Sequence, residues 1–282
     1  MDKAQPSRTA LRVALRRAAH QIYDAPPLVL DDPLAVRILG TEYAEDLRKT
    51  ETKLNKFFSI ALRAFLVARS RHAESCLARA VAAGVRQYCI LGAGLDTFAY
   101  RNPHPGLHVF EVDHPATQAW KRHLLRQSGI SLPETLSLVP IDFEQGSLAE
   151  RLEASGFDRG RPAFFAWLGV VPYLTLEAFR RTLRFIASGA RGSGLVMDYG
   201  QPRHVLPPLE QLARDSLASR VALAGEPFQL FFTREEIRGE LACFTELQDL
   251  GRDELNSLYF NQRTDNLQVR GSAGRVVSAS LA

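Results

Sequence analysis

Cysteine is scarce in this sequence, and its three copies, Cys76, Cys89 and Cys243, stand far apart. Isolated cysteines in an odd number, none at metal-binding or redox spacing, argue against a disulfide framework and against a cysteine-based metal site. They are instead expected to be buried thiols in a reducing compartment. The sequence therefore predicts a cytoplasmic protein that uses no metal.

Long apolar runs are also missing. The longest stretches, such as "AFFAWLGVV", fall far short of the roughly 20 residues that a membrane span needs. The N-terminal stretch lacks the continuous apolar core of a signal peptide, although its arginines leave an organellar targeting helix as an alternative. We expect no membrane partner.

Lysine is rare, with five copies against thirty arginines, and the formal net charge is only +4. The basic residues are spread along the chain, so they are expected to form a solvated surface, with nucleic-acid binding as the weaker alternative. At 282 residues and 46% hydrophobic composition the chain is long and apolar enough for a sizeable core.

The first third of the sequence is expected to be helical. In "DDPLAVRILG", Asp32 is suited to cap a helix that begins at Pro33, and Gly40 is placed to end it. Residues 56–83 carry apolar and charged side chains at helical spacing, and Gly84 follows them as a stop. Two helical segments are therefore predicted before any strand.

After residue 84 short apolar runs alternate with stretches long enough for helices. The runs are "RQYCILG", "GLHVFEVD", "TLSLVPID", "PAFFAWLG" and "SGLVMDYG". Ser147 and Glu150 form a capping box in one of the gaps. Strands that alternate with helices indicate a parallel sheet covered on both faces. We predict a doubly wound α/β core over residues 85–282 behind a helical cap, or lid, over residues 1–84.

Beyond Gly200 the pattern loosens. "QPRHVLPPLEQL" has the composition of a connection, which we assign to an insertion at about residues 200–235. In "TREEI", Thr233 and Glu236 form a second capping box. "CFTELQDLG" is a candidate strand, and the tail "GSAGRVVSASLA" is either a last edge strand or a frayed end. With both counted, the mostly parallel sheet has seven strands.

Two glycines, Gly92 and Gly94, follow the first predicted strand in "LGAGLDT". Ligands of a doubly wound sheet bind beyond the carboxyl ends of its strands, and glycine lets the backbone approach them closely. The next strand ends in "VFEVD", where Asp113 is placed to accept hydrogen bonds from both hydroxyls of a ribose. A simple tight turn is the alternative. Thr97 stands where a dinucleotide-binding loop has its third glycine, which favours a nucleoside ligand other than a dinucleotide.

Five motifs, taken together, resemble a known family. "RSRHAE", "ILGAGLDTFAYR", "VFEVDHP", "VPIDF" and "FFAWLGVVPYLT" stand in the order and spacing of class I S-adenosylmethionine-dependent methyltransferases of the leucine carboxyl methyltransferase-like group. That group contains protein C-terminal carboxyl methyltransferases and bacterial O-methyltransferases of small metabolites. The resemblance covers about residues 31–200, with a weaker echo in "LQDLGRDELNSLYF".

The resemblance implies a cofactor, S-adenosyl-L-methionine, and a product, S-adenosyl-L-homocysteine. It places the loop of Gly92, Ala93 and Gly94 under the methionine part of that cofactor and Asp113 at the ribose. His114 is grouped with these residues, although its place before Pro115 also suits the start of a helix.

The resemblance implies further contacts at the two ends of the cofactor. Asp142 would hold the adenine amino group, and the backbone of Phe143 would touch the ring edge. Arg69 would pair with the cofactor carboxylate, with Arg71 as the near alternative, since a guanidinium grips a carboxylate with two hydrogen bonds. The alternative for either arginine is a solvated helix position.

One departure concerns the protein-carboxyl branch, which carries a glutamate after the fourth strand where this chain has Leu168. This puts a cofactor contact and a protein substrate in doubt and favours a small-molecule acceptor. Trp167 is counted among the cofactor contacts. It is also a candidate for a wall of the substrate pocket, with a position in the hydrophobic core as the alternative.

The acceptor is predicted to be the carboxyl group of a small molecule. A polyketide or another secondary metabolite is the candidate class for that molecule. A carboxylate with a pKa of about 4 is already ionised at neutral pH, whereas a phenol with a pKa of about 10 profits from a general base. Candidates for catalysis are His204, Tyr173 and Tyr199, and candidates for substrate contact are Tyr173, Tyr199 and Arg203. Either tyrosine is alternatively a core residue.

Several alternatives stay open from the sequence. Within the same class, a hydroxyl or phenol group is the alternative acceptor. From other classes, a nicotinamide-dependent oxidoreductase or a non-catalytic nucleotide-binding module would share the glycine loop. No nucleic-acid partner is expected, and the chain is predicted to be a monomer or a homodimer.

Overall fold

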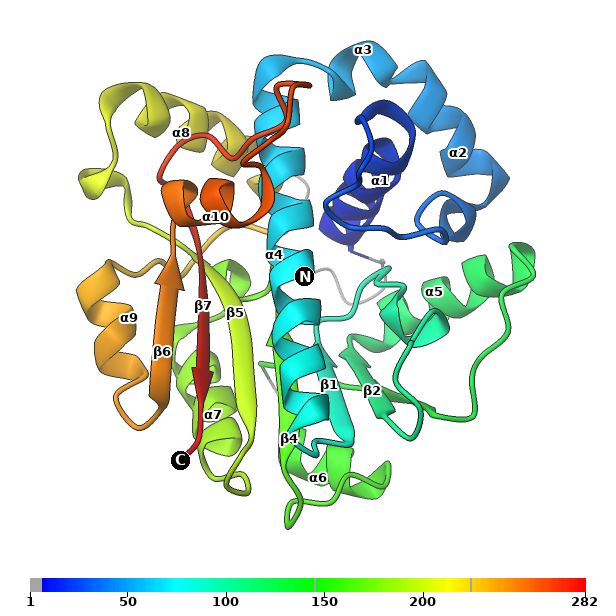
Figure 1. Ribbon diagram of the computed structural model, residues 1–282, viewed down its shortest axis with the longest axis vertical. Coiled ribbons are helices and arrows are strands. Elements are labelled where there is room, and N and C mark those ends of the chain that lie inside the picture. The colour runs from blue at the N-terminus through cyan, green and yellow to red at the C-terminus, as the bar shows by residue number, and fades with distance from the viewer. Residues whose placement is uncertain (1–6, 145, 224) are drawn as a thin grey trace.

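The computed structural model describes residues 7–144, 146–223 and 225–282, arranged around a seven-stranded sheet (Figure 1). The order of the strands is β3-β2-β1-β4-β5-β7-β6, so the direction in which strands are added reverses between β1 and β4. The predicted doubly wound α/β fold is confirmed. The strands are β1 (Gln87–Leu91), β2 (His108–Asp113), β3 (Leu136–Pro140), β4 (Ala163–Trp167), β5 (Gly194–Gly200), β6 (Thr245–Leu250) and β7 (Gly274–Ser280).

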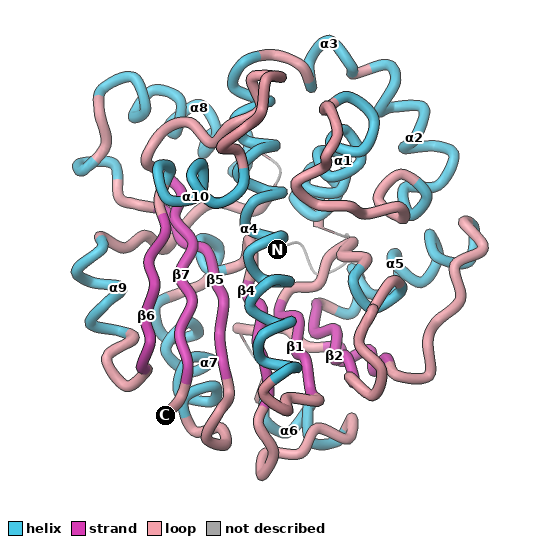
Figure 2. Tube along the Cα trace, in the orientation of Figure 1, coloured by secondary structure: helices cyan, strands magenta, loops and turns pink. Residues whose placement is uncertain are grey.

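Helices surround this sheet and gather beyond one end of it (Figure 2). Residues 1–6 of the predicted cap and residue 224 of the predicted insertion lie outside the described ranges. The α-helices are α1 (Arg8–Tyr23), α2 (Gly40–Lys49), α3 (Glu51–Leu54), α4 (Phe57–Ala82), α5 (Pro115–Gln127), α6 (Leu148–Ala154), α7 (Leu176–Ala187), α8 (Pro208–Ala222), α9 (Arg234–Glu240) and α10 (Arg252–Tyr259).

The last strand lies inside the sheet. β7 pairs antiparallel with β5 on one side and with β6 on the other, whereas all pairs formed among β1 to β5 are parallel. Residues 275–279 of β7 are all buried. The predicted strand is confirmed, but its place at an edge was wrong and the tail is not frayed. The serines and the arginine of this segment gave no sign in the composition that it is buried.

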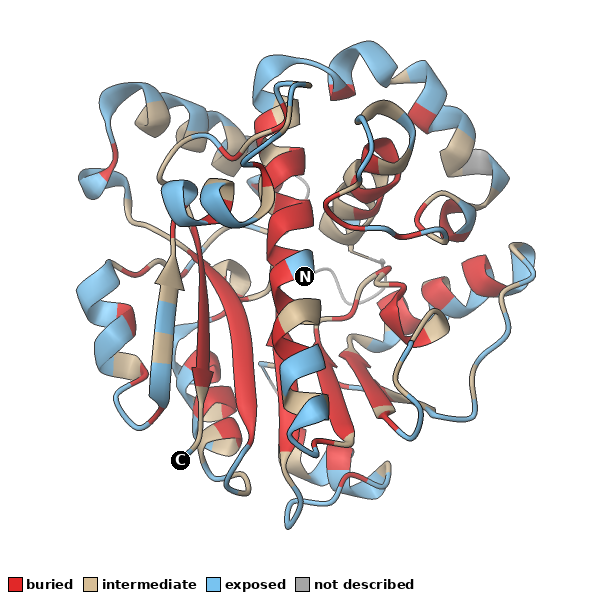
Figure 3. Ribbon diagram, viewed as in Figure 1, coloured by how far each residue is buried: buried red, intermediate tan, exposed pale blue. Residues whose placement is uncertain are grey.

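Helix α4 covers one face of the sheet, running along it in Figure 1. Its residues Ala64, Val67 and Ala68 pack in one apolar cluster with Phe164 of β4 and Val196 of β5. The buried stripe of α4 is visible in Figure 3. The sequence grouped this helix with the lid, but its packing makes it part of the sheet's own core.

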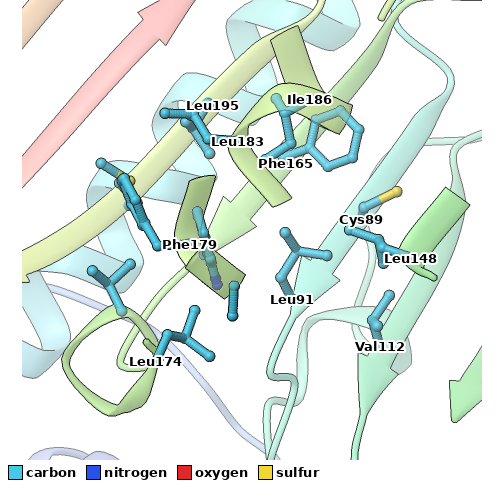
Figure 4. Close-up of a cluster of buried hydrophobic side chains, with 14 of the residues drawn as sticks. Cys89, Leu91, Val112, Leu148, Phe165, Leu174, Phe179, Leu183, Ile186 and Leu195 are labelled. Atoms are coloured by element: carbon cyan, nitrogen blue, oxygen red, sulfur yellow. The ribbon is translucent and has the colours of Figure 1, made fainter. Parts of the chain in front are cut away.

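Helices α6, α7 and α9 cover the opposite face. Leu183 and Ile186 of α7 lie against Phe165 and Leu195 of the sheet (Figure 4). Thr175 begins α7 by accepting a hydrogen bond from the Ala178 amide (3.2 Å).

Capping and thiol predictions are partly confirmed. The capping box of Thr233 and Glu236 forms in full at the start of α9, and Ser147 caps α6 through the amide of Glu150. Cys76 and Cys89 are buried, as expected. The third thiol is exposed, because Cys243 lies in the turn before β6, so its predicted burial was wrong.

The segment after residue 31 departs from the predicted helix. Residues 33–36 form a turn, a short 3₁₀ helix follows over Arg37–Leu39, and Gly40 begins α2 instead of ending a helix. Asp32 caps nothing, because its buried carboxylate accepts hydrogen bonds from Arg17 (2.8 Å) and Thr97 (2.7 Å).

The region after β5 is also more ordered than predicted. The sequence indicated a connection, but Pro208–Ala222 forms α8, with Pro208 at its first turn. Among the described residues, no helix combines the length and the apolar character that crossing a bilayer requires.

Candidate functional site

The glycine loop follows β1 at the carboxyl edge of the sheet. The amides of Gly92 and Ala93 donate to the carbonyl of Val112 on β2 (2.8 and 3.1 Å). Gly92 (φ +72°) and Gly94 (φ +49°) both have positive φ values, which side chains disfavour. A Cβ on Gly92 would lie 2.1 Å from Val170, and one on Gly94 would lie 3.1 Å from Ala10. The loop is thus closely covered by Val170, from the segment that follows β4, and by Ala10 of α1.

Alanine at position 92 should destabilise the protein more than alanine at Gly106. Both glycines have positive φ (+72° and +74°), but a Cβ on Gly106 meets nothing within 4 Å. The difference in unfolding free energy, measured by denaturant titration, should be about 1–3 kcal/mol, the usual effect of overpacking. Equal losses in the two variants would show that Val170 moves aside freely.

Two acids end the next strands of the sheet. Asp113, the last residue of β2, accepts hydrogen bonds from the amides of Gly94 (2.5 Å) and His114 (2.6 Å). Its carbonyl accepts from Ile141, which directly precedes Asp142 beyond β3. Both residues therefore lie at the same edge of the sheet as the glycine loop, where the Asp142 carboxylate accepts from the amide of Glu144 (3.0 Å).

Burial raises the pKa of Asp113, opposed by the amides of Gly94 and His114. His114 is the N-cap of α5, where its Nδ1 accepts from the amide of Ala116 (3.2 Å). The predicted helix start at His114 is confirmed. Phe143 is half-buried against the α7 face, and its carbonyl accepts from Arg181 (2.6 Å).

The structure brings Arg69, and not Arg71, to this edge. Arg71 is exposed on α4. Arg69 is buried, and its Nη1 donates to Oδ2 of Asp198 on β5 (2.5 Å). Its guanidinium lies beside Gly169, where a Cβ would come within 2.8 Å of Nη2. The next residue, Val170, is the one that contacts Gly92.

Helix α1 lies across the loop. Ala10 contacts Gly94, and the Ser7 amide donates to Thr117 of α5 (3.4 Å). Thr9 donates through its hydroxyl to Glu226 (2.5 Å) in the segment after α8. The first turn of α1 therefore joins the sheet edge to the 200–235 insertion.

Tyr173 lies under this junction. Its hydroxyl donates to Thr9 (3.5 Å), and its pKa is raised to about 12 by burial and by the charges of Glu226 and Asp198. Its ring begins an aromatic row, which we define as Tyr173, Phe228 and Phe231, with centroids 5.2 and 6.0 Å apart. The guanidinium of Arg214 on α8 lies 4.0 Å from the Phe231 ring centroid.

The other predicted site residues lie apart from this row. Trp167 is fully buried and stacks on Phe179 of α7 (5.3 Å), which is a packing role in the core. The hydroxyl of Tyr199 lies 3.1 Å from both carboxylate oxygens of Asp249 on β6.

Two candidates of the sequence lie in the short helix that follows β5. His204 is exposed there. Arg203 is exposed and pairs with Asp215 of α8 (3.0 Å). Among the described residues, neither side chain forms a hydrogen bond with Arg69 or with the glycine loop.

Sequence reasoning missed several residues of the site. Asp198 lies in the predicted strand "SGLVMDYG", where an acid at the carboxyl end was a usable signal. Arg214 and the contacts of α1 gave no such signal, because they depend on how the cap and the insertion fold back. Among the described residues there is no group of three or more metal-binding side chains.

A seven-stranded sheet with an antiparallel β7, a glycine loop after β1 and an acid at the end of β2 define a class I S-adenosylmethionine-dependent methyltransferase. The profile of the family "Leucine carboxyl methyltransferase" matches residues 10–187. The chain belongs to this family.

Similar proteins carry names of the same enzyme class. The chain is 33% identical to a protein of Bacillus subtilis (strain 168) named "Putative S-adenosyl-L-methionine-dependent methyltransferase YktD", over 95% of this chain and 96% of that protein. A protein of Mycolicibacterium gilvum (strain PYR-GCK) named for the same class is 36% identical, over 68% of this chain and 65% of its own length. The nicotinamide and non-catalytic alternatives are thereby set aside.

Solved structures share the fold. A protein from Thermobifida fusca, assigned as a methyltransferase, has a TM-score of 0.61 at 17% identity, over 100% of this chain and 97% of its own. Magnesium protoporphyrin IX methyltransferase from Synechocystis, solved with bound S-adenosylhomocysteine, has a TM-score of 0.50 at 15% identity, over 89% of this chain and 100% of its own. At these identities the likeness concerns the fold.

The residues at the sheet edge suit this cofactor on structural grounds. The Nε of Arg69 is buried and has no hydrogen-bond partner among the described residues, so it is free to donate to a ligand carboxylate. Asp113 has lone pairs beyond the two that its amide donors use.

Proposed function

We propose that S-adenosylmethionine binds over the glycine loop, with Asp113 at the ribose hydroxyls, Asp142 at the adenine and Arg69 at the carboxylate. When bound there, this cofactor supplies an electrophilic methyl group. The buried setting of Arg69 and the half-buried setting of Asp113 support this placement, because charged hydrogen bonds gain strength where water is excluded.

We further propose that the acceptor is the carboxyl group of a small molecule. A bond forms between the carboxylate oxygen and the methyl carbon while the carbon–sulfur bond breaks, and the sulfonium charge is neutralised. No proton is released, so the protein only has to align the two reactants and exclude water. Tyr173 can align the acceptor by donating a hydrogen bond to it, because its pKa of about 12 keeps it protonated at neutral pH and its present bond to Thr9 is long (3.5 Å).

The environment of Arg214 is the observation that supports a carboxyl acceptor. Its Nε is buried and has no partner among the described residues, and its guanidinium lies on Phe231 at the end of the aromatic row. Aromatic rings and an incompletely satisfied guanidinium suit an acceptor that combines an apolar body with an acidic group. Such an acceptor would extend from Tyr173 toward α8.

The acceptor class can be tested with methyl-labelled cofactor and a panel of aromatic and aliphatic carboxylic acids and phenols. We expect labelled product from acids, and expect mild base to release the label as methanol, because esters hydrolyse and aryl ethers do not. A base-stable product would reject the ester and favour a phenol acceptor.

Two arginine variants sharpen this test. Arg214→Met should raise the KM for the acid about 10- to 100-fold, the range of a charged hydrogen bond, without changing the Kd for S-adenosylhomocysteine. Arg203→Met, which changes an exposed arginine on the neighbouring short helix, should leave both constants unchanged. An unaltered KM in Arg214→Met would move the acid-binding group elsewhere.

We propose that the enzyme acts in the cytoplasm on a small molecule of secondary metabolism. We expect it to be a monomer or a homodimer and to have no nucleic-acid or membrane partner. The +4 net charge spread along the chain and the scattered thiols support this assignment.

A further inference from the structure

Arg69 and Asp198 form a buried pair of opposite charge at the carboxyl edge of the sheet. Arg69 comes from α4 and Asp198 from β5, and their side chains are 8% and 7% exposed. Removing two charges from water is costly, and an isolated buried pair contributes little net stability. A buried pair at the edge where ligands bind therefore suggests a role in binding.

The pair lies directly beside the glycine loop. Oδ1 of Asp198 accepts a hydrogen bond from the amide of Gly169 (2.5 Å), the second residue after β4. Gly169 (φ +75°) faces the Arg69 guanidinium, and the following residue, Val170, faces Gly92. Two consecutive residues thus connect the ion pair to the loop over which the cofactor is placed.

Both partners have unused hydrogen-bonding capacity. The buried Nε of Arg69 donates to no described residue. A carboxylate offers about four lone-pair sites, and Asp198 uses two of them, for Arg69 and Gly169. The pair can therefore receive one additional anion on the arginine and one additional cation on the aspartate.

A ligand that carries both charges on neighbouring atoms satisfies this arrangement. An α-amino acid end is such a ligand, because its carboxylate and its ammonium are attached to the same carbon. Alternating the charges as aspartate, ammonium, carboxylate and arginine leaves none of the four unpaired. Leu168, between β4 and Gly169, is apolar and offers no acid for the ammonium.

We propose that Asp198 binds the α-ammonium group of the methionine part of S-adenosylmethionine, while Arg69 binds its carboxylate. This inference rests on the cofactor placement proposed above and adds a residue from β5 to it. Asp198 also holds Gly169, so the same carboxylate positions the loop after β4 and selects for a free amino group.

The test compares three ligands by calorimetry: S-adenosylhomocysteine, its analogue without the α-amino group, and 5′-methylthioadenosine, which lacks the amino-acid end. The wild type should bind the deaminated analogue about 10- to 100-fold more weakly than S-adenosylhomocysteine, as expected for one charged hydrogen bond. In Asp198→Asn this ratio should fall to within about threefold, with the affinity for 5′-methylthioadenosine unchanged. A ratio in Asp198→Asn equal to that of the wild type would overturn the proposal.

Two further variants guard against a trivial result. Asp198→Asn leaves Arg69 buried without its carboxylate, so the double variant Arg69→Met/Asp198→Met should be measured as well. It removes both charges, a change that proteins often tolerate, and it should bind 5′-methylthioadenosine while losing the preference for S-adenosylhomocysteine. Asp249→Asn breaks a comparable buried pair with Arg275 (2.8 Å) between β6 and β7, and its ligand ratio should equal that of the wild type.

Failure of the inference and failure of the proposed function give different results. If the wild type bound S-adenosylhomocysteine and its deaminated analogue equally well, the role of Asp198 would be wrong and the cofactor placement would stand. If the wild type bound none of the three ligands, the cofactor placement would be wrong, and the role of Asp198 with it.

Discussion

Asparagine at position 113 should weaken the binding of S-adenosylhomocysteine by at least about 100-fold. The carboxylate of Asp113 is placed to accept hydrogen bonds from two ribose hydroxyls, and a hydrogen bond to a charged group contributes about 1.5–3 kcal/mol. Losing the charge should therefore remove about 3–6 kcal/mol, or about two to four powers of ten in Kd.

Asparagine is a sharper choice than alanine at this position. Asp113 accepts from the amides of Gly94 and His114, and asparagine retains an oxygen for one of these two bonds, whereas alanine would lose both and loosen the glycine loop further. Calorimetry would give the Kd, and thermal unfolding would show that the fold persists. Glu134→Gln, at an exposed acid in the loop before β3, is the matched control. A Kd within threefold of the wild type would place the ribose elsewhere.

The glycine loop and its acid were predictable because they are local features of sequence. Gly92, Gly94 and Asp113 are separated from their strands by at most a few residues, and the period of a strand fixes which side chains share a face. The partner of Arg69 was not predictable in this way. Asp198 lies 129 residues further along the chain, and only the packing of α4 against β5 brings the two together.

Thr97 explains why the loop lacks a third glycine. Its hydroxyl donates to Asp32 (2.7 Å) and accepts from Arg17 (3.1 Å). Glycine offers no hydroxyl, so the residue that departs from the dinucleotide pattern is used to fasten the cap. The sequence showed the departure correctly, but its cause depends on side chains from α1 and from the segment before α2.

The misjudged helix after residue 31 has the same origin. Asp32 followed by Pro33 is a good local signal for a helix start, and in isolation it favours the predicted cap. In the folded chain the carboxylate of Asp32 is completely buried and paired with Arg17. A tertiary ion pair outcompeted a local cap, and the helical start moved to Gly40.

Methionine in place of Arg17 should destabilise the protein by about 3–5 kcal/mol, the usual effect of breaking a buried ion pair from one side. Arg17 of α1 pairs with Asp32 (2.8 Å) and with Asp96 in the glycine-loop segment (2.6 Å), and its own side chain is 6% exposed. Methionine keeps much of the length but leaves both acids without this partner. Because Arg17 holds α1 across the loop, the affinity for S-adenosylhomocysteine should fall as well.

Denaturant unfolding at several pH values would test this expectation. Burial by itself raises the pKa of Asp96, but Arg17, Lys121 and Arg101 together lower it to about 2. An aspartate has a pKa of about 4 in the unfolded chain, so this acid stabilises the fold above about pH 4 and loses that contribution as the pH falls toward 2. In Arg17→Met the acid-dependent loss should shrink, because the largest favourable charge is gone. Arg8→Met, at an exposed position of α1, should match the wild type in both respects. A loss below about 1 kcal/mol, typical of a surface ion pair, would mean that apolar packing and not this network holds α1 against the glycine loop.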